Sequence, residues 1–213
     1  MRISELSAAS RVPIPTIKYY LREGLLPPGE QISATRAVYG EPHLRRLRLI
    51  RALLEVGRLP LTTIHKVIEA VEDEQLGVHE MLGVAHYALA AEVEPGDPDD
   101  EEWRAAREQA DTLVEEYGLR LSPQAPTRDE LAQVLVTLAR LGVPASADDL
   151  RPYAEAARRL AAEHEMSRIP VTGPRDAAVE ALVIYTVLYG RAFDVLRRMA
   201  QESASAFAAE AGS

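Results

Sequence analysis

Apolar residues recur at every third or fourth position along most of the chain, and this spacing predicts a mainly α-helical protein. Near the N-terminus it predicts a short helix over about residues 4–10. A second helix is expected to begin at Pro15, since the first turn of a helix tolerates a residue without an N–H. In this second helix Ile17, Tyr20 and Leu21 share one face, which should point inward. Two short helices joined by a turn are typical of a helix-turn-helix, although any small helical hairpin shares this pattern.

A polar loop and an arginine-rich helix follow this pair. Residues 27–29 read Pro-Pro-Gly and end the second helix, and residues 37–39 predict a brief strand, as in a two-stranded wing. Leucines and arginines then alternate with helical spacing over residues 42–56. After a short loop, a threonine at 62–63 is expected to cap a fourth helix. This order favours a winged helix-turn-helix, whose second helix can enter the DNA major groove.

Charge is distributed unevenly between this segment and the rest of the chain. Residues 1–70 hold 11 Lys and Arg against 6 Asp and Glu, a net charge of +5, whereas the whole chain of 213 residues carries −9. Residues 71–213 therefore carry −14. Phosphate binding needs a local basic surface and not a basic protein. The asymmetry alone is equally consistent with two solvated surfaces, but together with the helix order it favours DNA contact by the N-terminal segment.

Several motifs stand in a specific order in the first third of the chain. They are Thr16-Ile17-Lys18-Tyr19-Tyr20, Gly24-Leu25-Leu26, the wing residue Tyr39, the helix at 44–57 and the loop Arg58-Leu59-Pro60-Leu61. In this combination, residues 1–72 resemble the N-terminal domain of MerR-family transcription regulators. Two positions depart from the family pattern. Lys18 replaces an arginine, and Ala37 stands where the wing arginine is usual, with Arg36 one residue earlier.

The candidate DNA-binding residues come from the second helix, the two wings and the third helix. They are Thr16, Lys18, Tyr19, Tyr20, Arg22, Arg36, Tyr39, Arg45, Arg46 and Arg58. Most should contact phosphates, whereas Thr16, Lys18 and Tyr19 are placed for base edges. Tyr20 is expected to pack inward beside Ile17.

The resemblance also implies what such a domain does. It implies a homodimer that binds palindromic, double-stranded promoter DNA and untwists it, so that RNA polymerase is affected indirectly. The alternative is a protein-interaction module that uses a winged-helix fold without binding DNA. Clustering of the basic residues on the second helix and the wings favours DNA over this alternative.

The rest of the chain predicts an all-α region without a family motif. Helices are expected at about 78–93, 102–117, 128–141, 147–166 and 174–203. The sequence thus predicts a winged helix-turn-helix domain at residues 1–73 and an all-α dimerisation domain at residues 74–213. The first and the last of these helices are both candidates for the dimer interface. The aromatic side chains are more often plain core, but they could also line a pocket for a small, mainly apolar organic effector.

The sequence offers no convincing candidate for catalysis or metal binding. It contains no cysteine, which excludes disulfides and thiolate metal sites, and its five histidines form no His-x-x-x-His pair. It also lacks a glycine-rich phosphate loop and a nucleophile elbow. We therefore expect neither an enzyme nor a cofactor. A leader segment and an apolar run of about 20 residues are both missing, so we expect a cytoplasmic protein with no membrane contact.

Overall fold

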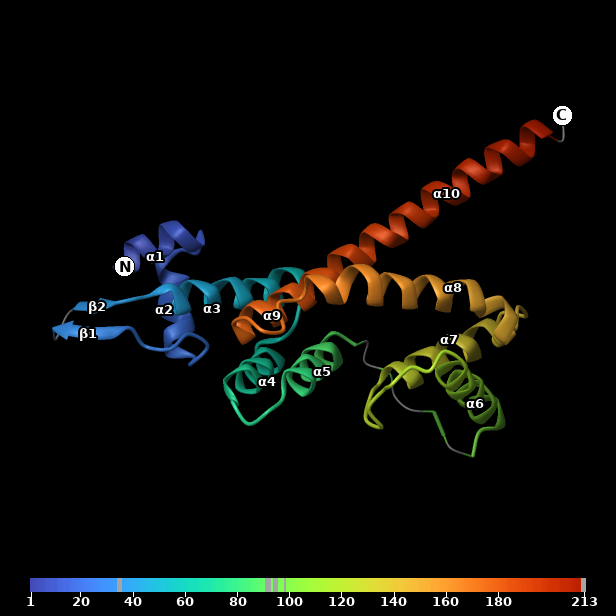
Figure 1. The fold of residues 1–213 in the computed structure, drawn as a ribbon, viewed down its shortest axis with the longest axis horizontal. Coiled ribbons are helices and arrows are strands. Elements are labelled where there is room, and N and C mark those ends of the chain that lie inside the picture. Colours follow the sequence, from blue (N-terminus) through green and yellow to red (C-terminus); the bar gives the residue numbers. More distant parts are fainter. Residues whose placement is uncertain (34–35, 91–92, 94–95, 98, 212–213) are drawn as a thin grey trace. The chain divides into compact units, whose positions relative to one another are not determined.

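The computed structural model describes residues 1–33, 36–90, 93, 96–97 and 99–211 (Figure 1). It is mainly helical with one small two-stranded sheet, which confirms the predicted fold class. The chain divides into two compact units. Unit 1 combines Met1–Ala88 with Ile169–Ser213, and unit 2 is Leu89–Arg168.

Unit 1 begins with the winged module, which we define as residues 1–72. Its elements are α1 (Ile3–Ser10), α2 (Ile14–Arg22), β1 (Glu30–Ser33), β2 (Arg36–Val38), α3 (Glu41–Arg51), the π-helical turn η1 (Ala52–Val56) and α4 (Leu61–Glu72). The same unit also contains α5 (Val78–Leu89), α9 (Arg175–Val183), the π-helical turn η4 (Ile184–Tyr189) and α10 (Gly190–Ala211). The predicted order of elements in the winged module is confirmed. Of the helix predicted at 78–93, residues 91–92 lie outside the described residues.

The core of the winged module lies where the inward faces of its helices meet. Leu6 of α1, Ile17 of α2, Leu47 and Ile50 of α3 and Ile64 of α4 have no exposed surface. Each such side chain contributes about 1.5–3 kcal/mol to stability when it leaves water. These contacts therefore fix the orientation of α2 relative to the helices that support it.

The turn after α2 sets the path of the chain towards the wing. Gly24 has a φ of 74°, a left-handed conformation that glycine adopts without strain. This lets the N–H groups of Leu25 and Leu26 donate to the carbonyl of Tyr20, at 3.0 and 3.2 Å. The predicted role of Gly24 at the end of the second helix is confirmed. Leu25 and Leu26 are then directed into the core.

The start of α4 differs from the sequence-based expectation. A threonine at 62–63 was expected to cap this helix, but α4 begins earlier, at Leu61, with Pro60 in the capping position. Pro60 has an extended backbone, and its carbonyl accepts hydrogen bonds from the N–H groups of Thr63 and Ile64, both at 3.0 Å. The threonine prediction was therefore wrong, because the preceding proline already fixes the backbone that begins the helix.

The helix α9 packs on the winged module, although it lies about a hundred residues further along the chain. Its buried residues are Ala178, Val179, Leu182 and Val183. At its N-terminus, the guanidinium of Arg175 donates hydrogen bonds to four backbone carbonyls at the end of α4 and the turn after it. The acceptors are Ala70, Val71, Asp73 and Leu76, at 2.8–2.9 Å. A charged side chain thus caps the C-terminus of α4.

Unit 2 is a small helical assembly built around a hairpin. Its elements are α6 (Glu101–Glu116), α7 (Thr127–Arg140), α8 (Ala147–Leu160), the π-helical turn η2 (Ala161–Glu165) and the 3-10 turn η3 (Met166–Arg168). Trp103 and Ala106 of α6 pack against Ala132, Leu135 and Val136 of α7.

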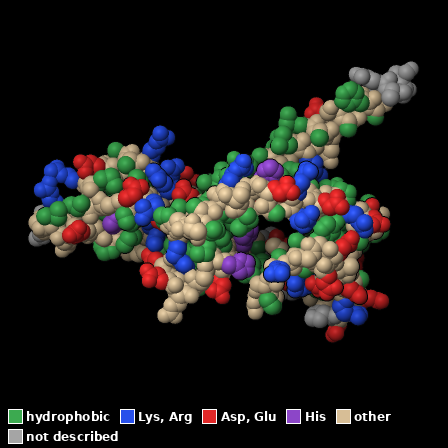
Figure 2. All heavy atoms as spheres, in the orientation of Figure 1, with side chains coloured by type: hydrophobic (Ala, Val, Ile, Leu, Met, Phe, Trp, Pro, Cys, Tyr) green, Lys and Arg blue, Asp and Glu red, His purple; other side chains and the backbone are tan. Residues whose placement is uncertain are grey.

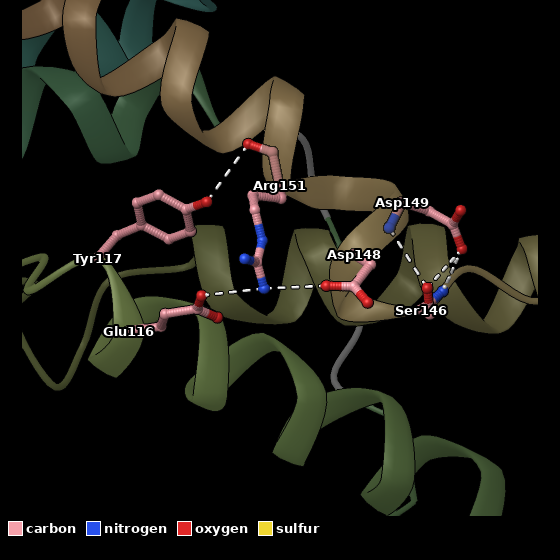
Figure 3. A network of polar contacts seen from close by, with 6 residues as sticks. All are labelled: Glu116, Tyr117, Ser146, Asp148, Asp149 and Arg151. Atoms are coloured by element: carbon pink, nitrogen blue, oxygen red, sulfur yellow. Dashed lines mark hydrogen bonds and ion pairs between the residues drawn. The ribbon is translucent and has the colours of Figure 1, made fainter.

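Polar contacts link the first turns of α8 to the end of α6 (Figure 3). Arg151 lies between Glu116 and Asp148, at 3.4 and 2.9 Å, and its carbonyl accepts a hydrogen bond from the Tyr117 hydroxyl at 3.4 Å. The Ser146 hydroxyl and backbone N–H donate to Asp149, which lowers the pKa of that carboxyl. This reciprocal cap fixes the start of α8.

Among the described residues, no helix is long and apolar enough to cross a membrane.

Candidate nucleic-acid interface

The helix α2 presents a polar face outward and an apolar face inward. Ile17 is fully buried and Tyr20 is 7% exposed, which confirms the predicted inward face. Lys18 and Arg22 are exposed, and Tyr19 is partly exposed. Burial raises the pKa of the Tyr20 hydroxyl, and the nearby carboxylate of Glu55 raises it further. Tyr20 therefore serves mainly as an anchor for the helix.

The outward face of α2 is organised by contacts among its own side chains. The guanidinium carbon of Arg22 lies 5.3 Å from the centre of the Tyr19 ring, within reach of a cation–π interaction. The Tyr19 and Tyr20 ring centres are 5.9 Å apart. Arg22 also lies 3.4 Å from Glu23, but both side chains are exposed, and such pairs contribute little. Arg22 is therefore accessible to a phosphate, with Tyr19 beside it.

Wing one is the antiparallel pair β1–β2, in which Glu30 lies opposite Val38 and Gln31 opposite Ala37. Arg36, at the start of β2, is exposed. It comes from an element that the structure places next to the masked residues 34–35, of which nothing further is said. Its exposure leaves the guanidinium available for an external anion.

Tyr39, predicted to bind DNA from wing one, is held inside the module. It is only 7% exposed, and its backbone N–H donates to the Met1 carbonyl at 2.8 Å while its own carbonyl accepts from the Met1 amino group at 2.7 Å. A side chain on Gly29 would approach the Tyr39 ring to 2.9 Å, so glycine is needed there. In this conformation Tyr39 fixes the base of the wing to the N-terminus of the chain.

His43 is a positioning residue that the sequence analysis missed. Its Nδ1 accepts a hydrogen bond from the Gly40 N–H at 3.1 Å, and its Nε2 lies 3.3 Å from the carbonyl of Pro28. Its ring meets the Tyr39 ring edge-on, with the centres 5.2 Å apart. His43 thus connects the start of α3 to both ends of wing one. The available signal was a ring nitrogen three residues after a glycine that precedes a helix.

Two predicted DNA-binding arginines on α3 are occupied within unit 1. Arg46 is 9% exposed and donates to the Glu72 carboxylate at 2.7 Å and to the Leu25 carbonyl at 3.4 Å. Arg45 lies 3.5 Å from Asp176 of α9. These contacts join α3 to α4, to the turn after α2 and to α9.

Wing two and the back of α3 supply further cations. Arg58 is exposed and has a φ of 55°, an uncommon left-handed conformation for a residue with a side chain. Arg51, which the sequence analysis did not select, donates to the Ser10 carbonyl at 3.3 Å and to both oxygens of Glu55. The hydrogen bonds from Arg51 lower the pKa of Glu55. Arg51 therefore holds α1 against α3.

The exposed cations of the winged module include residues outside the predicted set. Arg2, Arg11 and Lys66 are all exposed. Figure 2 shows Lys and Arg side chains spread over the visible face of this module, with several Asp and Glu between them. The surface is therefore mixed, and phosphate contact depends on individual cations at the end of α2 and on the wings.

Comparison with known proteins places this geometry in a family. The model of the MerR helix-turn-helix regulatory protein family matches residues 1–71. The chain is also similar to a solved structure, the candidate transcriptional regulator SCO5550 from Streptomyces coelicolor A3(2). The two share 38% sequence identity over 97% of this chain and 96% of that one, with a TM-score of 0.77. The comparison with curated proteins gave no match.

The chain therefore belongs to the MerR family of helix-turn-helix regulatory proteins. It is a DNA-binding transcriptional regulator, as the resemblance of its N-terminal motifs implied.

Proposed function

We propose that the protein binds double-stranded promoter DNA as a homodimer, with α2 of each copy in the major groove of one half-site. The observation that carries this proposal is the two-sided character of α2. Lys18 and Arg22 are exposed on a helix whose other face is anchored through Ile17 and Tyr20. An anchored helix with an open polar face can present side chains to base edges at little cost in ordering.

We assign separate tasks to the exposed residues. Thr16, Lys18 and Tyr19 face the bases, and Arg22 neutralises a phosphate beside the groove. Arg36 and Arg58 reach flanking phosphates from the two wings. Lysine lacks the planar fork of arginine, so Lys18 is expected to specify a base less strictly than an arginine there would.

Four members of the predicted set act, in this proposal, by holding the reader in place. Tyr20 and Tyr39 are buried and position α2 and wing one. Arg45 and Arg46 already face carboxylates of Asp176 and Glu72 within the unit. Releasing a buried guanidinium from its carboxylate to reach DNA would cost more than a surface contact returns.

Two copies are required because a palindromic operator repeats the same half-site about a two-fold axis. In this proposal residues 1–73 read the DNA and residues 74–213 hold the two readers at a set separation. RNA polymerase is affected indirectly, through the shape of the promoter.

We also propose that a small organic effector controls the regulator through unit 2. A groove of about 640 Å³ lies in that unit. It is lined by Glu116, Tyr117, Pro152, Glu155, Ala156, Arg158, Arg159 and Glu163. This lining is mainly charged, so it favours a polar or ionic organic molecule over the apolar one expected from the sequence.

A gel shift with a salt titration tests the DNA-binding proposal. If about 6–10 phosphates are contacted, the affinity should fall about 10³–10⁵-fold between 50 and 200 mM salt. A full-length protein that shifts promoter DNA at no salt concentration would instead favour the protein-interaction module. The Glu41→Gln variant is a suitable control, because Glu41 is exposed at the start of α3 and outside the proposed contacts.

A further inference from the structure

The helix α10 has a continuous apolar face that no part of unit 1 covers. Every residue from 191 to 208 is exposed, including several large apolar side chains. Those on η4 and α10 with more than a third of their surface exposed are Leu188, Tyr189, Phe193, Val195, Leu196, Met199 and Phe207. Hydrophobic side chains are visible along this helix in Figure 2. A patch of this extent is typical of an interaction site.

The apolar residues of this face follow the spacing of a coiled coil. Tyr185, Tyr189, Ala192, Leu196 and Met199 are separated alternately by four and three residues, and small residues continue the series at 203 and 206. The series spans about three heptads, the length at which such a pattern indicates a coiled coil.

The charged residues of α10 lie off this seam. Arg191, Asp194, Arg197 and Arg198 all fall on the three heptad positions that face away from it, and Glu202 flanks it. The seam is therefore bordered by solvated charges and is itself free of them, as expected for a surface that another helix covers.

We infer that α10 pairs with α10 of a second copy in an antiparallel coiled coil. This inference rests on the homodimer of the proposed function, and it names the interface. The other candidate, α5, already buries Met81, Leu82 and Ala85 within its own chain. Its apolar face is thus occupied, whereas that of α10 is open.

Charge along α10 favours the antiparallel arrangement. The first half of the helix carries three arginines and one aspartate, whereas the second half carries Glu202 and Glu210 and no cation. Antiparallel pairing places the positive half of each helix beside the negative half of the other. Parallel pairing would place like charges side by side, which is destabilising.

The sizes of the seam residues favour the same arrangement. When Leu196 is aligned with Met199 of the second copy, Tyr189 lies opposite Ala206, and Ala192 lies opposite Ser203. The bulky end of one helix then meets the small-residue end of the other, which fills space evenly. In a parallel pair, Tyr189 would face its own equivalent while Ala206 would leave a gap.

Sedimentation of the full chain tests the interface. We expect the wild-type protein to sediment at twice its chain mass of 23.4 kDa and Leu196→Glu to sediment as a monomer. Gln201→Glu introduces the same charge on the opposite side of α10 and should remain a dimer. A far-ultraviolet circular dichroism spectrum like that of the wild type would show that Leu196→Glu still folds.

The absence of native cysteine provides a test of the orientation. Disulfide formation requires Cβ atoms about 3.5–4.5 Å apart. In an antiparallel pair, Tyr189→Cys and Ala206→Cys should form disulfide-linked dimers only when the two variants are mixed. Cross-linking of each variant with itself would overturn the antiparallel arrangement.

The outcomes separate this inference from the proposed function. A Leu196→Glu protein that stays dimeric overturns the α10 interface and leaves the homodimer standing. A monomeric wild-type protein overturns the homodimer itself. If that monomer also loses thermal stability on Leu196→Glu, the apolar face is covered by unit 2 of the same chain.

Discussion

The helices α2 and α10 are both amphipathic, yet the fold uses them in opposite ways. The nine-residue α2 buries Ile17 and Tyr20 in the winged module and leaves its polar face open. The 22-residue α10 has no buried residue among those described, and its apolar face is the open one. An apolar stripe stabilises a fold only where a surface of the same chain meets it. Where none does, the stripe indicates a partner.

The largest expected difference is between two leucines, one from each kind of surface. Leu47 of α3 has no exposed surface, whereas Leu196 of α10 is 61% exposed. Leu47→Ala should lower the free energy of unfolding by about 2–5 kcal/mol, because it removes buried methyl groups and leaves a cavity. Chemical denaturation followed by circular dichroism gives this value.

Leu196→Ala is the matched change, and it should act differently. At concentrations where the protein is monomeric, it should change the free energy of unfolding by less than about 0.5 kcal/mol. At higher concentrations it should weaken dimerisation. Equal and concentration-independent losses for both leucines would remove the distinction between the two surfaces.

A smaller effect is expected where the C-terminal part of unit 1 grips the winged module. Arg175→Ala removes the hydrogen bonds to four carbonyls at the end of α4 and should lower the melting temperature, with a loss of about 2–3 kcal/mol. Arg175→Lys should retain only part of the stability, since an ammonium cannot reach four acceptors in the same plane. If the winged fragment 1–74 melts at the same temperature as the full chain, the grip contributes nothing.

The smallest expected effect concerns the open face of α2. Lys18→Ala should weaken operator binding by about 1–2 kcal/mol, roughly five- to thirtyfold, and leave the melting temperature unchanged, because Lys18 is exposed. Fluorescence anisotropy with labelled operator DNA measures the affinity. The adjacent Tyr20→Ala serves as the contrast, since it should lower the melting temperature. A Lys18→Ala protein with full affinity would remove this residue from the interface.

The sequence by itself determined the order of elements in the winged module and the two faces of α2. Both follow from local periodicity, and the turn at Gly24 follows from the need for a left-handed residue. The sequence also indicated the MerR family, through motifs close together in the chain. The DNA-binding roles of the individual residues remain predictions.

Only the tertiary structure decided which side chains of the candidate interface are available. Sequence spacing cannot show that Arg46 meets Glu72, 26 positions away, or that Arg175 caps α4 from 105 positions away. Helical periodicity identified an apolar face on both α2 and α10 in the same way. Whether a face is buried depends on long-range packing, which local periodicity does not encode, and this packing turned α2 into a reader and left α10 open to a second chain.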